Sequence, residues 1–175
     1  MQKKDKQENK ATTMRISSER DVLQSGKKTC VSRALDLSTN QHIVLKSVTT
    51  FAQQKDIRYL KKEYEVGMFL TQKNCCHTIK FLDWLEDSTS ATSVPTIVQE
   101  YGGQSLSSLI HNRRGLPLGE FLGYSLQLAE GLQEMHDNCV IHKDIKPNNV
   151  VVSASGTLKY IDFGSASFDN NTNVQ

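Results

Sequence analysis

Residues 142–149 read HKDIKPNN, and residues 162–164 read DFG. Between them lie the apolar run VVV at 150–152, the turn-forming run SASG at 153–156 and a second apolar stretch that ends at Ile161. This order predicts a β-hairpin with a polar segment at each end. The two polar segments are the strongest functional signal in the chain.

An amphipathic helix is predicted before this hairpin. It begins at Pro117, and proline suits the first turn of a helix. A continuous stripe along it is formed by Phe121, Leu122, Ser125, Leu128, Ala129, Leu132 and Met135. A shorter helix is expected over residues 105–112.

The first half of the chain is richer in strands. Strand-like sequence begins near Val22, and further strands are predicted at residues 29–35, 42–48, 81–86 and 96–101. The Ser/Thr-rich residues 87–95 are expected to form a loop, and residues 55–71 have helical periodicity. Strands concentrated in the first half, with helices and a hairpin after them, predict the α+β class.

Composition excludes several classes of protein. The chain has 175 residues, 37% hydrophobic and 23% charged, with a formal net charge of +2. These values indicate an ordinary soluble domain, and so small a charge gives no argument for a nucleic-acid partner. No apolar run reaches the length of a membrane span. The 4 cysteines contain no Cys-x-x-Cys pair, which favours a reduced, cytoplasmic setting.

The segments at 142–149 and 162–164 resemble the catalytic loop H-R-D-x-x-x-x-N and the metal loop D-F-G of eukaryotic-type protein kinases. The resemblance implies a small antiparallel β-sheet lobe followed by the start of a mainly helical lobe. Its boundaries would be a disordered polar tail at 1–20, the first lobe and hinge at 21–103 and a partial second lobe at 104–175.

The resemblance also implies roles for the polar groups of these two segments. Asp144 would orient the attacking hydroxyl and accept its proton, and Lys146 would place a positive charge beside the transferred phosphate. Asn149 and Asp162 would supply oxygen ligands to magnesium. The simpler interpretation is a polar turn between buried strands, but a turn alone does not explain four polar groups at matching spacings.

Residues 43–46, IVLK, resemble the V-A-I-K strand of the same family, in which the lysine contacts the α- and β-phosphates and pairs with a helix glutamate. Glu63 and Glu65 are the candidates for that partner. Glu63 shares one helical face with apolar residues, whereas Glu65 lies near Lys61 and is expected to face solvent. Glu63 is therefore the predicted partner of Lys46.

Residues 96–103, TIVQEYGG, resemble the hinge between the two kinase lobes. The resemblance places Gln99 at the back of the adenine pocket. The adenine edge would bond to backbone groups of Glu100, Tyr101 and Gly102. The faces of the base would contact Val31, Val44 and Val151, which could equally be core residues.

The glycine-rich loop departs from the family pattern. Aligned on Val31, the three positions of G-x-G-x-x-G hold Gln24, Gly26 and Thr29. Only Gly26 remains as a nucleotide-binding glycine, so the loop should be stiffer or lie further from ATP. The charges of Lys27 and Lys28 could partly offset this loss, although both could equally be surface residues.

Two more departures bear on function. Lys143 replaces the arginine of H-R-D, and lysine grips a phosphate less well than the bidentate guanidinium, which puts control by activation-loop phosphorylation in doubt. The chain ends soon after Gly164 without an A-P-E motif. We therefore expect a piece of a longer kinase, with C-terminal domains missing and an apolar face of the long helix exposed.

The resemblance implies a kinase that uses ATP and magnesium to phosphorylate serine or threonine of a protein substrate. Lys146, two residues after Asp144, favours this class over tyrosine kinases. One alternative is a pseudokinase-like module that binds a nucleotide or a partner with little turnover. Another is a small-molecule kinase of the aminoglycoside or choline type, against which Lys146-Pro147 and the complete D-F-G argue.

Overall fold

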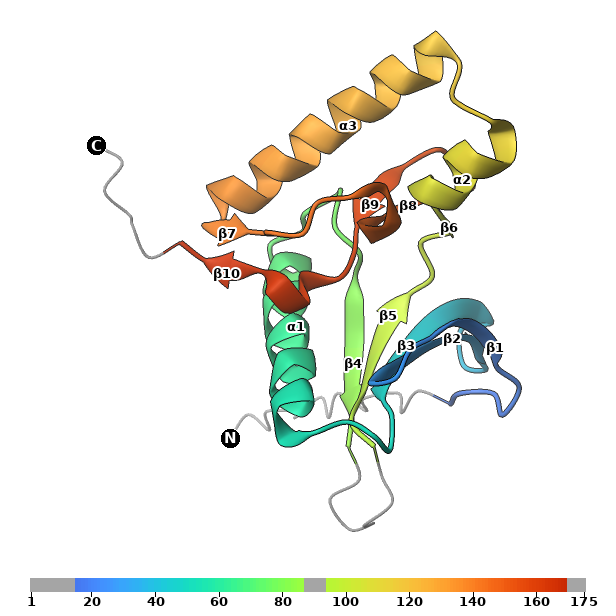
Figure 1. Ribbon diagram of the computed structural model, residues 1–175, viewed down its shortest axis with the longest axis vertical. Helices are drawn as coiled ribbons and strands as arrows, with labels where there is room; N and C mark the ends of the chain where they lie inside the picture. The colour runs from blue at the N-terminus through green and yellow to red at the C-terminus, as the bar shows by residue number, and fades with distance from the viewer. Residues whose placement is uncertain (1–14, 87–93, 170–175) are drawn as a thin grey trace, which may run out of the picture.

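The computed structural model describes residues 15–86 and 94–169. It contains an antiparallel sheet followed by helices and two smaller sheets, which confirms the predicted α+β class. In Figure 1 the larger sheet and helix α1 form one half of the molecule, and helices α2 and α3 lie in the other half.

The larger sheet has five antiparallel strands that differ strongly in burial. Their spatial order is β1 (Asp21–Ser25), β2 (Thr29–Asp36), β3 (Gln41–Val48), β5 (Thr96–Glu100) and β4 (Phe81–Leu85). The four segments predicted after Val22 thus form strands within a residue or two of the expected bounds. All of β1 is exposed, whereas four of the five residues of β5 are buried. The β1 edge of the sheet is therefore its least buried part.

Helix α1 (Gln54–Gln72) packs on this sheet through the face that its periodicity predicts. Leu60, Glu63, Gly67 and Leu70 are buried together, and Glu65 is exposed. A Cβ on Gly67 would lie 2.0 Å from the Phe81 ring. The glycine therefore lets the helix and β4 approach closely.

The second half begins with two helices, α2 (Leu106–Arg113) and α3 (Leu118–Asp137), and Pro117 is the N-cap residue of α3. The predicted stripe of α3 is buried only toward its C-terminal end. Met135 is fully buried, whereas Phe121 and Leu122 are 54% and 57% exposed. The exposed apolar face expected from the sequence is therefore present at the start of α3.

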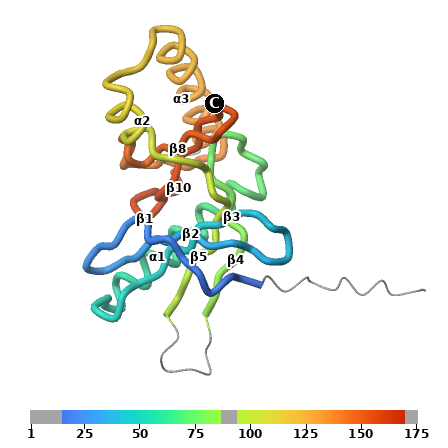
Figure 2. The backbone as a smooth tube through the Cα atoms, turned by 90° about the vertical axis from the view of Figure 1, so that its right-hand side faces the viewer, coloured from blue at the N-terminus to red at the C-terminus, as the bar shows by residue number. Residues whose placement is uncertain are grey.

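The predicted hairpin forms from β8 (Val150–Val152) and β9 (Leu158–Tyr160). Three very short strands around it were not predicted from the sequence. These are β6 (Gln104–Ser105), which pairs with β8, and β7 (Val140–Ile141), which pairs with β10 (Ser167–Phe168). Figure 2 shows β8 in the half of the molecule that holds α2 and α3, and β10 between that half and the larger sheet. Short 3-10 turns at Pro147–Asn149 and Phe163–Ser165 complete the described chain.

Two glycines, Gly102 and Gly103, connect the two halves of the molecule after β5. Gly103 has a φ of +101°, and a Cβ at this position would lie 2.0 Å from the carbonyl oxygen of Val152. Any side chain here would be strained and would collide with β8. The hinge can therefore lie directly on the second half of the molecule.

Residues 15–20 are attached to the sheet, although the sequence assigned them to a tail. Ile16 forms a bridge with Asp36, and the Ser17 amide donates to the carbonyl oxygen of Leu35 at 2.9 Å. The remaining tail residues, 1–14, and most of the predicted loop, 87–93, lie outside the described residues. Among the helices that the structure describes, none combines the length and the apolar character needed to traverse a bilayer.

Candidate active site

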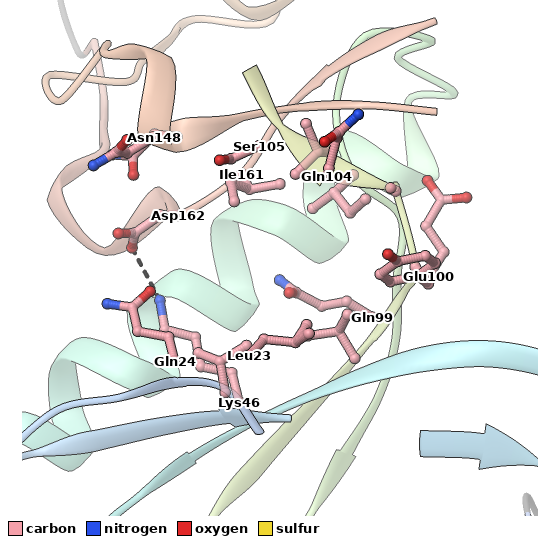
Figure 3. A pocket seen from close by; sticks show the side chains of 18 of the residues that line it. Leu23, Gln24, Lys46, Gln99, Glu100, Gln104, Ser105, Asn148, Ile161 and Asp162 are labelled. Carbon is pink, nitrogen blue, oxygen red and sulfur yellow. Dashed lines mark hydrogen bonds and ion pairs between the residues drawn. The ribbon is translucent and has the colours of Figure 1, made fainter. Parts of the chain in front are cut away.

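A cavity of about 680 Å³ lies between the larger sheet and the second half of the molecule. Its volume is typical of small-molecule sites. Of the residues that the resemblance assigned to a nucleotide, it is lined by Val31, Val44, Lys46, Gln99, Glu100, Tyr101, Gly102 and Val151. In Figure 3, Lys46, Asp162 and Asn148 lie toward one end of the cavity, and Glu100 and Gln104 lie toward the other.

Lys46 forms ion pairs with carboxylates from two distant segments. Its Nζ lies 2.7 Å from both carboxylate oxygens of Glu63 on α1 and 3.0 Å from Oδ1 of Asp162. Burial acts to lower the pKa of Lys46, but the charges of Glu63 and Asp162 outweigh it and raise that pKa. Burial also raises the pKa of Glu63, against the effect of Lys46. Lys46 is therefore held as a cation at neutral pH.

Asp144 lies at the centre of a second polar group. Lys146 Nζ donates to Asp144 Oδ2 at 2.7 Å, and Asn149 Nδ2 donates to the same oxygen at 2.8 Å and to the Asp144 carbonyl at 2.9 Å. The hydrogen bond from Lys146 is the main cause that lowers the pKa of Asp144. Asp144 does not itself line the cavity, but Lys146 and Asn149 do. The carboxylate is thus ionised and fixed at the edge of the cavity.

His142 connects the two polar segments beneath the cavity. Its Nε2 lies 3.0 Å from the carbonyl oxygen of Ile161, and its Nδ1 lies 3.3 Å from the Asp144 amide. Because the carbonyl can only accept and the amide can only donate, these two hydrogen bonds fit the imidazole tautomer that carries its proton on Nε2. The buried His142 ring therefore fixes the backbone at Asp144 relative to the backbone just before Asp162.

The backbone at Asp162 is unusual. Its φ is +66°, in the left-handed region that residues with a side chain seldom adopt. The next residue, Phe163, is fully buried and packs against the rings of Phe81 and His142. This packing turns the Phe163 ring into the core and leaves the Asp162 carboxylate, 41% exposed, in the cavity.

We call residues 142–149 and 162–164 the floor of the cavity, and β1 with the turn into β2 its roof. In the roof, a bulge between Val22 and Gln24 shifts the pairing so that Gln24 lies opposite Val31. Both Leu23 and Gln24 consequently line the cavity. The sequence reasoning missed Leu23, whose only signal was its place next to the first position of the degenerate glycine pattern.

Two residues that were predicted near the nucleotide lie away from the cavity. Gly26 does not line the cavity, because its amide closes a turn by donating to the Thr29 carbonyl at 2.9 Å. Lys28 does not face the cavity with a free charge, since its Nζ lies 3.0 Å from Oδ1 of Asp56 at the start of α1. Asp56 also accepts from the Gln53 amide, and this bond, followed by that from Lys28, lowers the pKa of Asp56.

Several other residues that line the cavity were not anticipated. They are Thr29, Ile79, Gly103, Gln104, Ser105, Ser108, Asn148 and Ile161. Most of them are brought to the cavity by pairing between distant segments, as β6 is by its register with β8. Periodicity within one segment therefore could not identify them.

The donor set fits a magnesium ion only in part. Asn149 donates to Asp144 through its amide nitrogen, so the side-chain carbonyl oxygen of Asn149 is left to serve as a metal ligand. Asp162 uses Oδ1 for Lys46, and Oδ2 has no such partner. Within the described ranges, no group of three or more His, Cys, Asp or Glu side chains could hold a metal. Two protein oxygens suit magnesium when a phosphate ligand supplies further oxygens.

Comparisons with known proteins agree with this geometry. The family model described as the protein kinase domain matches residues 17–175. Mitogen-activated protein kinase kinase kinase 19 of Mus musculus is 31% identical over 126 residues, which is 72% of this chain and 9% of that protein. Mitogen-activated protein kinase kinase kinase 5 of Homo sapiens is 31% identical over 156 residues, which is 85% of this chain and 11% of that protein.

A third relative is shorter. The probable serine/threonine-protein kinase MRK1 homolog of Encephalitozoon cuniculi is 29% identical over 112 residues, which is 64% of this chain and 35% of that protein. The chain thus spans only a small part of the length of the curated relatives it matches.

Proposed function

The chain belongs to the protein kinase family, and from this premise we propose that it transfers the γ-phosphoryl group of ATP to serine or threonine of a protein substrate. The observation that carries the proposal is the joining of Lys46, Glu63 and Asp162 in one cavity. These residues are far apart in the sequence. Burying a cation between carboxylates costs desolvation free energy, and such groups cluster at functional sites.

The chemistry follows from the positions of the charged groups. The Lys46 ammonium would bind the α- and β-phosphates, while Glu63 fixes its direction. The substrate hydroxyl oxygen bonds to the γ-phosphorus, and the bond from that phosphorus to the bridging oxygen breaks to release ADP. The hydroxyl proton passes to the Asp144 carboxylate and then to solvent.

Two side chains would assist this transfer from the floor. Lys146, hydrogen-bonded to Asp144 at 2.7 Å, would stabilise charge on the transferred group. Asn149 and Asp162 would hold magnesium, which supplies charge neutralisation and alignment of the phosphates when bound.

Two observations support serine and threonine as the acceptors. Lys146 lies two residues after Asp144, and one relative is named a serine/threonine-protein kinase. We also propose a cytoplasmic setting, since the cysteines contain no Cys-x-x-Cys pair. We propose further domains in the full-length protein, because this chain covers 9% to 35% of the relatives named above. The two lobes would be residues 21–103 and 104–175, which meet at the glycine pair of the hinge.

The test is transfer of labelled phosphate. The chain is incubated with γ-labelled ATP, magnesium and casein, and the phosphoamino acids of the product are separated. We expect phosphoserine or phosphothreonine, and no label in the Asp144→Asn variant. Label on choline or an aminoglycoside, with none on protein, would contradict the proposal and favour a small-molecule kinase.

A second candidate function has one specific observation in its favour. The roof lacks two of three glycines, and its remaining Gly26 lies outside the cavity. A module that binds the nucleotide without efficient transfer would fit such a roof. Magnesium-dependent ATP binding by the chain, with loss of binding in Asp162→Ala and no transfer to casein, would establish this alternative.

A further inference from the structure

Gln99 occupies the inner part of the cavity. It lies on β5 between β3 and β4, opposite Val44 and Phe81, and only 6% of it is exposed. Figure 3 shows its side chain extending from the strand into the cavity, between the ends marked by Asp162 and Glu100. A long amide in this place is surrounded mainly by buried strand residues.

The amide nitrogen of Gln99 has no partner. Within residues 15–86 and 94–169, its Nε2 is the only buried side-chain nitrogen or oxygen without a hydrogen bond. A buried donor left unpaired costs free energy, so native proteins rarely retain one unless a ligand completes it. Because Nε2 belongs to a side chain that lines the cavity, an acceptor on the ligand is the natural partner.

The chemistry of an amide narrows the choice of ligand. A glutamine offers one donor and one acceptor side by side, and this spacing matches the exocyclic amine and N7 of adenine. Under the proposed function, backbone groups of the hinge bind the edge of adenine that carries N1 and the exocyclic amine. The adjacent edge, with the amine and N7, then faces the residue that precedes the hinge, which is Gln99.

We propose that Gln99 reads this second edge of adenine: Oε1 accepts from the exocyclic amine, and Nε2 donates to N7. The inference rests on the proposed function, because it needs ATP in the cavity. It makes Gln99 a determinant of base specificity. Guanine presents acceptors at both positions, so Oε1 would face a carbonyl oxygen and the pair would be repulsive.

The experiment removes the acceptor from the ligand. Dissociation constants are measured for ATP and for 7-deaza-ATP, in which a C–H group replaces N7, with the wild-type chain and with Gln99→Met. We expect the wild type to bind ATP about tenfold more tightly than 7-deaza-ATP, which corresponds to about 1.4 kcal/mol. In Gln99→Met, which keeps the length but has no hydrogen-bonding group, the ratio should fall to about one.

Gln41→Met is the matched control, since Gln41 is exposed on β3 and is not among the residues that line the cavity. It should keep the tenfold ratio of the wild type. Equal affinities of the wild-type chain for the two nucleotides would overturn the inference and leave the proposed function intact. Absence of ATP binding would remove both. The wild-type comparison needs no variant, so it holds even if Gln99→Met folds poorly.

Discussion

The floor and the roof of the cavity differ in how they are held. In the floor, Phe163 is fully buried and His142 is 1% exposed, and both contact segments from other parts of the chain. In the roof, all five residues of β1 are exposed, and the strand is held by its pairing with β2 and by the ion pair of Arg33 with Asp21. The groups proposed for chemistry thus rest on the core, whereas the part proposed to cover the phosphates is an exposed, paired strand.

This difference explains why the sequence departs from the kinase pattern in one place and keeps it in the other. A change in the floor would disturb packing and chemistry together. A change at Gln24 alters only an exposed strand, so the absence of a glycine at this position has little structural cost. Four predictions test the contrast, beginning with the floor.

The largest expected effect is on phosphoryl transfer in Asp144→Asn. The amide cannot accept the hydroxyl proton, so the rate of transfer should fall by about 10²- to 10⁴-fold. The dissociation constant of ATP should remain within about twofold, because Asp144 does not line the cavity. Asp137→Asn, an exposed position at the end of α3, is the control and should keep the wild-type rate. An active Asp144→Asn chain would contradict the assignment of the base.

The next largest effect is expected on stability, when a buried side chain of the floor is shortened. Phe163→Ala removes a fully buried ring, so the free energy of unfolding should fall by about 3–5 kcal/mol. Val22→Ala in the roof, where the side chain is 63% exposed, should cost under about 0.5 kcal/mol. Denaturant titration of both variants measures the contrast. Similar losses would show that the roof is as firmly built as the floor.

The pH profile of transfer should also report on the floor. Asp144 acts as an anion, and its lowered pKa keeps it ionised well into the acidic range. Lys146→Met removes the main cause of that lowering, so the pKa of Asp144 should rise. The acidic limb of the profile would then move to higher pH, in addition to any loss of maximal rate. An unmoved limb would show that Lys146 does not set the protonation of Asp144.

The smallest effect is expected in the roof. The double change Gln24→Gly with Thr29→Gly restores backbone that can approach phosphates, so ATP affinity should improve by roughly fivefold, the equivalent of about one hydrogen bond. Gly26→Ala should change the affinity by less than about twofold, because Gly26 lies outside the cavity and its φ is not positive. Weaker binding by the double variant would show that Gln24 itself holds the nucleotide.

The larger elements could be predicted because their sequences are locally consistent. Alternation in β2 and β3 and the apolar face of α1 set those elements, and a carboxylate on that face identified Glu63. The motifs of the floor identified the region around Asp144 and Asp162. These signals lie within single segments, which is where sequence patterns are informative.

The features that were missed arise between segments. The bulge after Val22, which turns Leu23 and Gln24 toward the cavity, adds one residue without changing the composition of the strand. The two-residue strands β6, β7 and β10 exist only because of the partner that each one finds. The position of Gly26 outside the cavity has a similar origin, since the turn that holds it there is closed by Thr29.

The contact of Lys28 with Asp56 ties the turn above the phosphates to the first turn of α1, two helical turns before Glu63. The roof and the orientation of the helix are thereby mechanically joined. Thermodynamic linkage requires such a joint to act in both directions with the same factor. Under the proposed function, a partner that binds the exposed side of α1 and holds it in place would strengthen nucleotide binding, and the nucleotide would strengthen the binding of that partner to the same degree.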